Sequence, residues 1–206
     1  MPELSVLVVF ISTFFFISLS PGLCMSLAMS LGMAFGLKKT LYMMIGELVG
    51  VATVAILAVI GVAAIMLRYP DLFTVLKWIG GIFLIYVGIN TIRRDDAIEL
   101  KVYSASSAPS KANLFMKGFI TAIANPKGWA FMISIFPPFI DDTKPITLQM
   151  VIFISVIMIT EFTCMLLYAS GGNKLRKILD KTNNTQWINR IGGGLLVAVG
   201  IWLALT

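Results

Sequence analysis

The chain has 206 residues, of which 58% are hydrophobic and 13% are charged, with a formal net charge of +6. A soluble domain keeps about a quarter of its residues charged, because water must wet its surface. The composition therefore excludes an ordinary soluble domain and indicates a surface that faces a lipid bilayer. The basic residues lie in short segments between apolar runs, where positive charge sets membrane orientation, so we expect no nucleic-acid partner.

Six apolar stretches follow one another along the chain. A membrane-spanning helix needs about 20 mainly apolar residues, and the stretches cover residues 4–36, 41–67, 72–92, 114–140, 146–170 and 191–205. The sequence thus predicts an all-α membrane protein with six transmembrane helices in a single domain, residues 1–206. No Lys or Arg precedes the first stretch, so we expect it to be a span and not a cleaved signal peptide.

Helix-breaking residues interrupt the first and fourth stretches. The interruptions are Ser20-Pro21-Gly22 and Asn125-Pro126-Lys127-Gly128. In transporters, broken helices expose backbone N–H and C=O groups that bind substrate or ions. Either proline alone would indicate a simple kink, but the matched pair favours a substrate-binding site formed by these two segments.

The basic residues are distributed unevenly between the two sides of the membrane. Twelve of the 16 Lys and Arg residues, including Lys38, Lys39 and Lys174, fall in the segments predicted as loops after the first, third and fifth spans. The positive-inside rule places these loops in the cytoplasm and both termini outside, in a bacterial inner membrane. The longest loop, residues 93–113, is polar and is expected to be a flexible linker.

The two halves of the chain match in order. Offsets of 105, 114 and 112 align the two helix breaks, the segments around Glu47 and Glu161, and the glycine-rich third and sixth spans. Three ordered matches favour a duplication over chance similarity. Because each copy has three spans, the second must enter from the opposite face, which predicts two inverted repeats, residues 1–92 and 114–206.

Three ionisable groups lie deep in apolar surroundings: Glu47, Glu161 and Lys127. A charge there costs on the order of 3 kcal/mol, so it persists when it pairs or lines a watered cavity. The glutamates could bind a substrate ammonium or exchange protons, or they could only pair helices or snorkel. Lys127 could face a substrate carboxylate, neutralise a glutamate or reach the cytoplasmic face. The chain has no histidine, so proton coupling would depend on the carboxylates.

Other sites are excluded or weakly indicated. A G-x-x-x-x-G-K-[ST] loop is absent from the sequence, so ATP is not the direct energy source. Cys24 and Cys164 lie in apolar runs without metal-ligand spacing, so we expect no metal site and no cofactor. Small-residue faces such as Gly32-x-x-x-Gly36 favour packing within the chain over a dimer seam, although a homodimer stays open.

These motifs resemble the LysE/RhtB family of bacterial amino-acid exporters over nearly the whole chain. The resemblance depends on Ser20-Pro21-Gly22, Gly46-Glu47 and Asn125-Pro126-Lys127. Family members typically have Ser-Pro-Gly-Pro, and here Leu23 replaces the second proline, so the first break is expected to be softer. The resemblance implies a secondary transporter, not an enzyme, that exports amino acids or related small metabolites by using the proton motive force.

Three functions remain open on the residues themselves. The first is proton antiport of a zwitterionic amino acid, with Glu47 and Glu161 binding protons or the ammonium. The second is export of a metal or other cation, for which Glu47, Glu161, Cys24 and Cys164 are the only candidate ligands. The third is a scaffold that transports nothing and in which the glutamates only pair helices.

Overall fold

The computed structural model describes residues 3–20, 22–93, 109–136, 139–140, 144–179 and 182–205. The helices in these ranges are α1 (Leu4–Leu19), α2 (Leu23–Phe35), α3 (Leu37–Arg68), α4 (Pro70–Ile92), α5 (Lys111–Ile123), α6 (Pro126–Ile135), α7 (Ile146–Leu179) and α8 (Thr182–Leu205). The prediction of an all-α chain is confirmed. Most of the predicted linker, residues 94–108, lies outside the described residues, as does Pro21.

Two helices of the described part are long and apolar enough to cross a membrane, Leu37–Gly61 within α3 and Ile146–Gly172 within α7. The pair α1 and α2 passes the same test as one span bent by 55°, and α4 contains the shorter apolar helix Trp78–Ile92. The described residues therefore supply two spans, or three if the bent pair counts as one. The six-span arrangement goes beyond this observation.

Both predicted helix breaks are present. Helix α1 ends at Leu19 and α2 begins at Leu23, and α5 ends at Ile123 before α6 begins at Pro126. Proline has no backbone N–H and its fixed φ suits the first turn of a helix, which explains why α6 starts at a proline. The interruptions are therefore encoded locally.

Two segments predicted as loops are partly helical. Gly36 alone separates α2 from α3, so Lys38 and Lys39 lie in the first turn of α3, and α7 continues through Lys174. Gly36 has φ +76° and Gly172, inside α7, has φ +41°. Glycine adopts this left-handed region at little cost, so the chain can change direction at these single residues.

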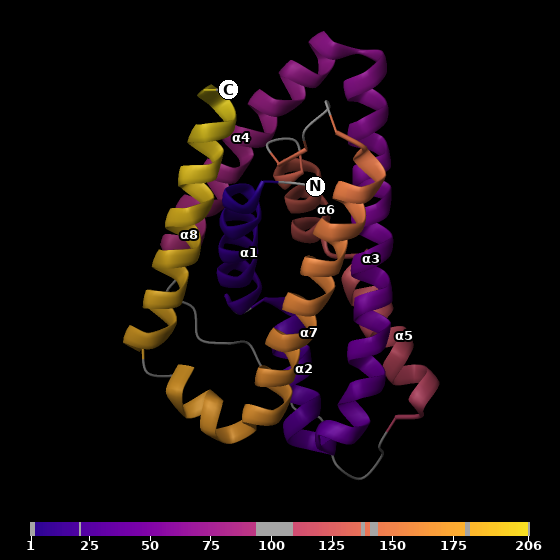
Figure 1. Cartoon of the computed structure of the whole chain (residues 1–206). Helices are drawn as coiled ribbons and strands as arrows, with labels where there is room; N and C mark the ends of the chain where they lie inside the picture. Colours follow the sequence, from indigo (N-terminus) through magenta and orange to yellow (C-terminus); the bar gives the residue numbers. More distant parts are fainter. Residues whose placement is uncertain are drawn as a thin grey trace.

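The long helices of the bundle form antiparallel pairs (Figure 1). Helices α3 and α7 pack together and run in opposite directions, and so do α4 and α8. Helices α3 and α5 also pack closely, as do α2 and α7. Both chain ends lie in the upper part of the view, and the α2–α3 turn lies at the bottom.

The crossing of α4 and α8 depends on glycine. A Cβ atom at Gly88 would lie 2.6 Å from the carbonyl oxygen of Gly193, and one at Gly200 would lie 2.7 Å from that of Gly81. Real Cβ atoms do not approach backbone atoms so closely, so only glycine permits this helix contact. The expected role of these glycines in packing within the chain is confirmed.

Two apolar clusters form the core. The phenylalanine cluster joins α1, α3, α4, α6, α7 and α8, and its rings are Phe10, Phe14, Phe131, Phe136, Phe139 and Phe153. The methionine cluster joins α2, α3, α5 and α7, and its thioether side chains are Met25, Met29, Met43, Met44 and Met165.

On each of the helices α3 and α7, a glutamate lies between residues of the two clusters. On α3, Glu47 lies between Met44 and Val54, which belong to different clusters. On α7, Glu161 lies between Ile157 and Cys164 in the same way. The two glutamates predicted as functional therefore occupy the level where the apolar core is interrupted.

Candidate functional site

Glu47 is the most deeply buried acidic side chain of the described part. It lies on α3 with 1% of its surface exposed. Its Oε2 atom has no hydrogen-bond partner among the described residues. An ionised carboxylate in such surroundings is costly unless another group binds it.

Cys24 joins Glu47 to the second helix break. It is the second residue of α2, and it lies within electrostatic interaction range of the Glu47 carboxyl group and of Asn125. Asn125 lies between α5 and α6. The contact therefore connects the beginning of α2, the middle of α3 and the α5–α6 break.

Glu161 completes the group from α7. Its Oε1 accepts a hydrogen bond of 3.0 Å from Ser18 Oγ, in the last turn of α1. Glu161 also interacts electrostatically with both Glu47 and Cys24. We call Glu47, Glu161, Cys24, Asn125 and Ser18 the carboxylate cluster. The two glutamates predicted from the sequence are thus brought together.

The end of α1 is held by the second half of the chain. The hydroxyl group of Tyr168 donates a 2.8 Å hydrogen bond to the carbonyl oxygen of Leu19, which the end of the helix leaves without an intrahelical partner. Ser20 Oγ donates a 2.9 Å hydrogen bond to Asn189 Oδ1 on α8. Two side chains from distant sequence therefore fix the first break.

Two half-helices begin beside the carboxylate cluster. Gly22 precedes α2 and provides no side-chain cap, so the first N–H groups of α2 lack that partner. At the other break, the Asn125 carbonyl oxygen accepts hydrogen bonds from the N–H groups of Gly128 and Trp129, at 3.0 and 3.3 Å. Helix N-termini carry a partial positive charge and bind anions. The Cys24–Asn125 contact places the two N-termini close together.

The predicted binding residues separate into three groups. Asn125 belongs to the carboxylate cluster, and Gly22 and Gly128 flank it at the starts of α2 and α6. Ser20 instead bonds to Asn189 and is 7% exposed. Pro126 and Lys127 occupy the first turn of α6, but their side chains, like the whole of Pro21, lie outside the described residues.

The amino-acid sequence matches the model of one protein family. The family is described as LysE type translocator, and the match covers residues 15–206. The chain belongs to the LysE-type translocators. It is therefore a member of a membrane transporter family and not of an enzyme family, as the sequence motifs predicted.

Relatives of this translocator include proteins with named substrates. A homoserine/homoserine lactone efflux protein of Salmonella typhimurium is 26% identical over 188 residues, which cover 91% of this chain and 90% of the relative. A leucine efflux protein of Salmonella choleraesuis is 30% identical over 102 residues, 50% of this chain and 48% of the relative. An uncharacterized membrane protein of Vibrio cholerae is 27% identical, over 91% and 90% of the two chains. No solved structure matches this translocator.

Four polar contacts of the translocator were missed by the sequence analysis. They involve Ser18, Cys24, Tyr168 and Asn189. Ser18 and Cys24 each lie two residues outside the Ser20–Gly22 break, and Tyr168 follows Glu161 by two helical turns on α7. Proximity to the break and a shared helix face are the signals that could have identified three of the four.

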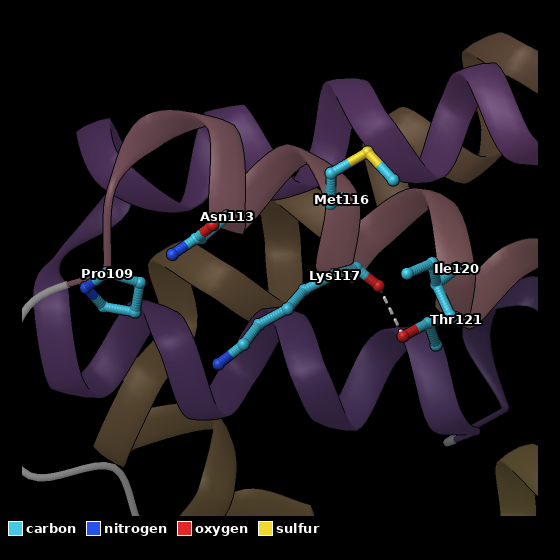
Figure 2. A pocket seen from close by; sticks show the side chains of 6 residues that line it. All are labelled: Pro109, Asn113, Met116, Lys117, Ile120 and Thr121. Carbon is cyan, nitrogen blue, oxygen red and sulfur yellow. Dashed lines mark hydrogen bonds between the residues drawn. The ribbon is translucent and has the colours of Figure 1, made fainter.

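A surface groove of the translocator lies on α5, and its lining residues do not include members of the carboxylate cluster. Figure 2 shows this groove on α5, lined by Pro109, Asn113, Met116, Lys117, Ile120 and Thr121. Met116 and Ile120 are exposed, whereas Gly118 on the other side of the helix packs against α3. Among the described residues, α5 and Pro109 line the groove and none of them is a carboxylate, so we do not assign the transport site to it.

The described residues also bear on the proposed metal export. Within those ranges, no group of three or more His, Cys, Asp and Glu side chains is arranged to hold a metal ion.

Proposed function

We propose that this translocator exports a zwitterionic amino acid, or a closely related small metabolite, from the cytoplasm in exchange for protons. The observation that carries the proposal is the proximity of a buried carboxylate, Glu47, and a half-buried one, Glu161, to Cys24 and Asn125, which lie at the starts of two half-helices. The names of the homoserine and leucine efflux relatives support the same substrate class.

The two kinds of polar group match the two ends of an amino acid. Glu47 and Glu161 supply negative charge for a substrate ammonium group. The N-termini of α2 and α6 supply N–H groups and positive partial charge for the substrate carboxylate, as they do for anions in other proteins. We assign Gly22, just before α2, and Lys127, in the first turn of α6, to the carboxylate end, because the Gly128 N–H already donates to the Asn125 carbonyl oxygen.

Proton exchange follows from the proximity of the two carboxylates. Two like charges in an apolar layer repel each other and lose hydration, so the pair favours binding a cation or a proton. In the proposed cycle the substrate ammonium occupies Glu47 and Glu161 on the way out, and protons replace it on the way back. The substrate and the protons then compete for the same oxygen atoms, which is a simple basis for antiport.

We further propose that the chain consists of two inverted repeats, residues 1–92 and 114–206, in one transmembrane domain with six spans. At the offset of 112, Gly81 and Gly88 correspond to Gly193 and Gly200. The contact between Gly88 and Gly193 then maps onto the contact between Gly200 and Gly81 when the halves are exchanged. Reciprocal contacts of this kind are typical of a two-fold axis, and here the paired helices α4 and α8 are antiparallel (Figure 1).

The proposed orientation places both termini outside the cytoplasm, in a bacterial inner membrane. Alkaline phosphatase fused after Thr206 is expected to be active, because the enzyme folds only outside the cytoplasm, and a fusion after Lys101 is expected to be inactive. Phosphatase activity in intact cells, normalised to the amount of fusion protein, measures this. Phosphatase activity of the Lys101 fusion alone would show that the chain has the opposite orientation in the membrane.

Transport itself is tested by counterflow in proteoliposomes. Vesicles loaded with unlabelled L-homoserine or L-leucine are expected to accumulate the same labelled amino acid through the protein, and an imposed pH gradient is expected to drive net uptake. Protein-free vesicles are the control. If neither these two nor any other amino acid of a full panel exchanges, and a pH gradient drives no uptake, the proposed function is wrong.

A further inference from the structure

Three side-chain hydrogen bonds hold the end of α1, and one of them differs from the others in its acceptor. Two of them end on neutral oxygen atoms, the carbonyl of Leu19 and the side-chain amide of Asn189. The third runs from Ser18 Oγ to Glu161 Oε1, at 3.0 Å. Of these three acceptors, the carboxyl group alone exchanges a proton. The strength of the Ser18 hydrogen bond therefore depends on whether Glu161 is ionised.

The Ser18 hydroxyl group has a second acceptor on its own helix. A serine within a helix can donate to the carbonyl oxygen four residues earlier, and for Ser18 that residue is Phe14. Ser30 on α2, 2% exposed, forms this local bond to Ser26 at 2.7 Å. Ser18 is similarly buried, at 5% exposed, but donates to α7 instead. It thus chooses between one acceptor on α1 and one on α7.

The charge of Glu161 determines which acceptor of Ser18 is favoured. A hydrogen bond to an ionised group is roughly twice as strong as one between neutral groups. Ionised Glu161 therefore competes successfully with the Phe14 carbonyl group. A proton on Glu161 removes this advantage, and the Phe14 oxygen is within reach of Ser18 wherever α1 lies relative to α7. The hydroxyl group then satisfies itself locally, as that of Ser30 does.

Titratable groups from three helices face Glu161. They include Glu47 on α3, Cys24 on α2 and Cys164 on α7 itself. Neighbouring charges influence when a carboxyl group takes up a proton. A serine hydroxyl group does not titrate, so Ser18 responds to the protonation of Glu161 without competing for the proton.

We propose that Ser18 is a positioning residue of the transport cycle, which ties the end of α1 to ionised Glu161 and turns back to Phe14 when a proton occupies that carboxyl group. The inference rests on the proposed function. Because α1 ends at Leu19, directly before the first helix break, the switch of Ser18 releases the break from α7. The charge of one buried carboxylate is in this way converted into a change in the attachment of a helix end.

The test compares two rates of the full chain in the same proteoliposomes. Counterflow exchanges substrate for substrate, whereas uptake driven by a pH gradient requires the protonated carrier as well. Ser18→Ala is expected to lower the ratio of pH-driven uptake to counterflow by at least about tenfold, the equivalent of one hydrogen bond to a charged group. Because the amount of folded protein cancels in this ratio, a variant that is only less stable leaves it unchanged. Ser18→Thr keeps the hydroxyl group and is expected to keep the ratio.

The matched control is Ser30→Ala, which removes a similarly buried serine hydroxyl group whose hydrogen bond is local. It is expected to leave the ratio of the two rates unchanged. An unchanged ratio in Ser18→Ala, an equal fall in Ser30→Ala, or a threonine at position 18 that behaves like alanine would overturn the inference, while transport by the unmodified protein still supports the proposed function. If a pH gradient drives no uptake by the unmodified protein, the proposed antiport fails and the inference falls with it.

Discussion

Replacing Glu47 with glutamine is expected to abolish uptake driven by a pH gradient and to reduce counterflow at low substrate concentration at least about 30-fold. Glutamine keeps the shape of the side chain but can bind neither a proton nor an ammonium group as a carboxylate does. Loss of one partner of a buried charge pair costs about 2–5 kcal/mol, and each 1.4 kcal/mol is tenfold in affinity. Initial rates in proteoliposomes measure the effect.

The matched control is Met116→Ala, in the groove on the outer face of α5 (Figure 2), which is expected to leave both rates unchanged. Thermal stability separates a transport role from a structural one. Because the variant removes a buried charge without removing volume, its melting temperature should equal or exceed that of the parent. A protein that still transports with protons after this change, or that no longer folds, would contradict the role proposed for Glu47.

A methyl group at Gly46 is expected to destabilise the fold by about 3 kcal/mol, the upper end of the range for overpacking. The Cβ of Gly46→Ala would overlap the carbonyl group of Phe115 on α5, and Gly118 meets the backbone of Met43 in the same interface. Since the obstacle is backbone and not a flexible side chain, α5 must move away from α3. Melting temperature in detergent is expected to fall by about 6–12 °C.

The control on the same helix is Gly61→Ala. Nothing lies within 4 Å of a Cβ built on Gly61, so this methyl group should change the melting temperature by less than about 2 °C, within the scatter of surface substitutions. Equal effects of the two substitutions would show that helix propensity, and not the α3–α5 contact, determines the response.

The helix breaks and the two glutamates could be predicted because each depends on the chemistry of a few adjacent residues. Pro126 lacks the backbone N–H that a helix interior needs, so it interrupts the helix locally, and Glu47 stands out in an apolar run. The turn at Gly36 could not be distinguished in the same way, because the sequence contains 17 glycines and most of them lie within helices.

The sequence could have pointed to the polar residues near the first break but not to their partners, because a hydroxyl group in a membrane helix has two kinds of partner. Ser30, Thr53 and Thr91 donate to the carbonyl oxygen four residues earlier, which satisfies them locally. Ser18 instead donates to Glu161, 143 residues away. Only the packing of α1 against α7 determines which partner is used, and that packing is absent from the local sequence.

The position of the carboxylate cluster between the phenylalanine and methionine clusters has a consequence for the energy balance of the cell. Apolar layers of this kind exclude water, so the buried residues of the two clusters, within the described part of the chain, offer the glutamates no hydrogen-bonding groups that lead to the aqueous phase. A carrier of this design would not let protons leak across the membrane in the absence of substrate, however many copies the membrane holds. The layers also differ, because thioether chains adapt their shape more readily than stacked rings. The methionine side would therefore admit solutes of varied shape, while the aromatic side would limit dissipation between turnovers.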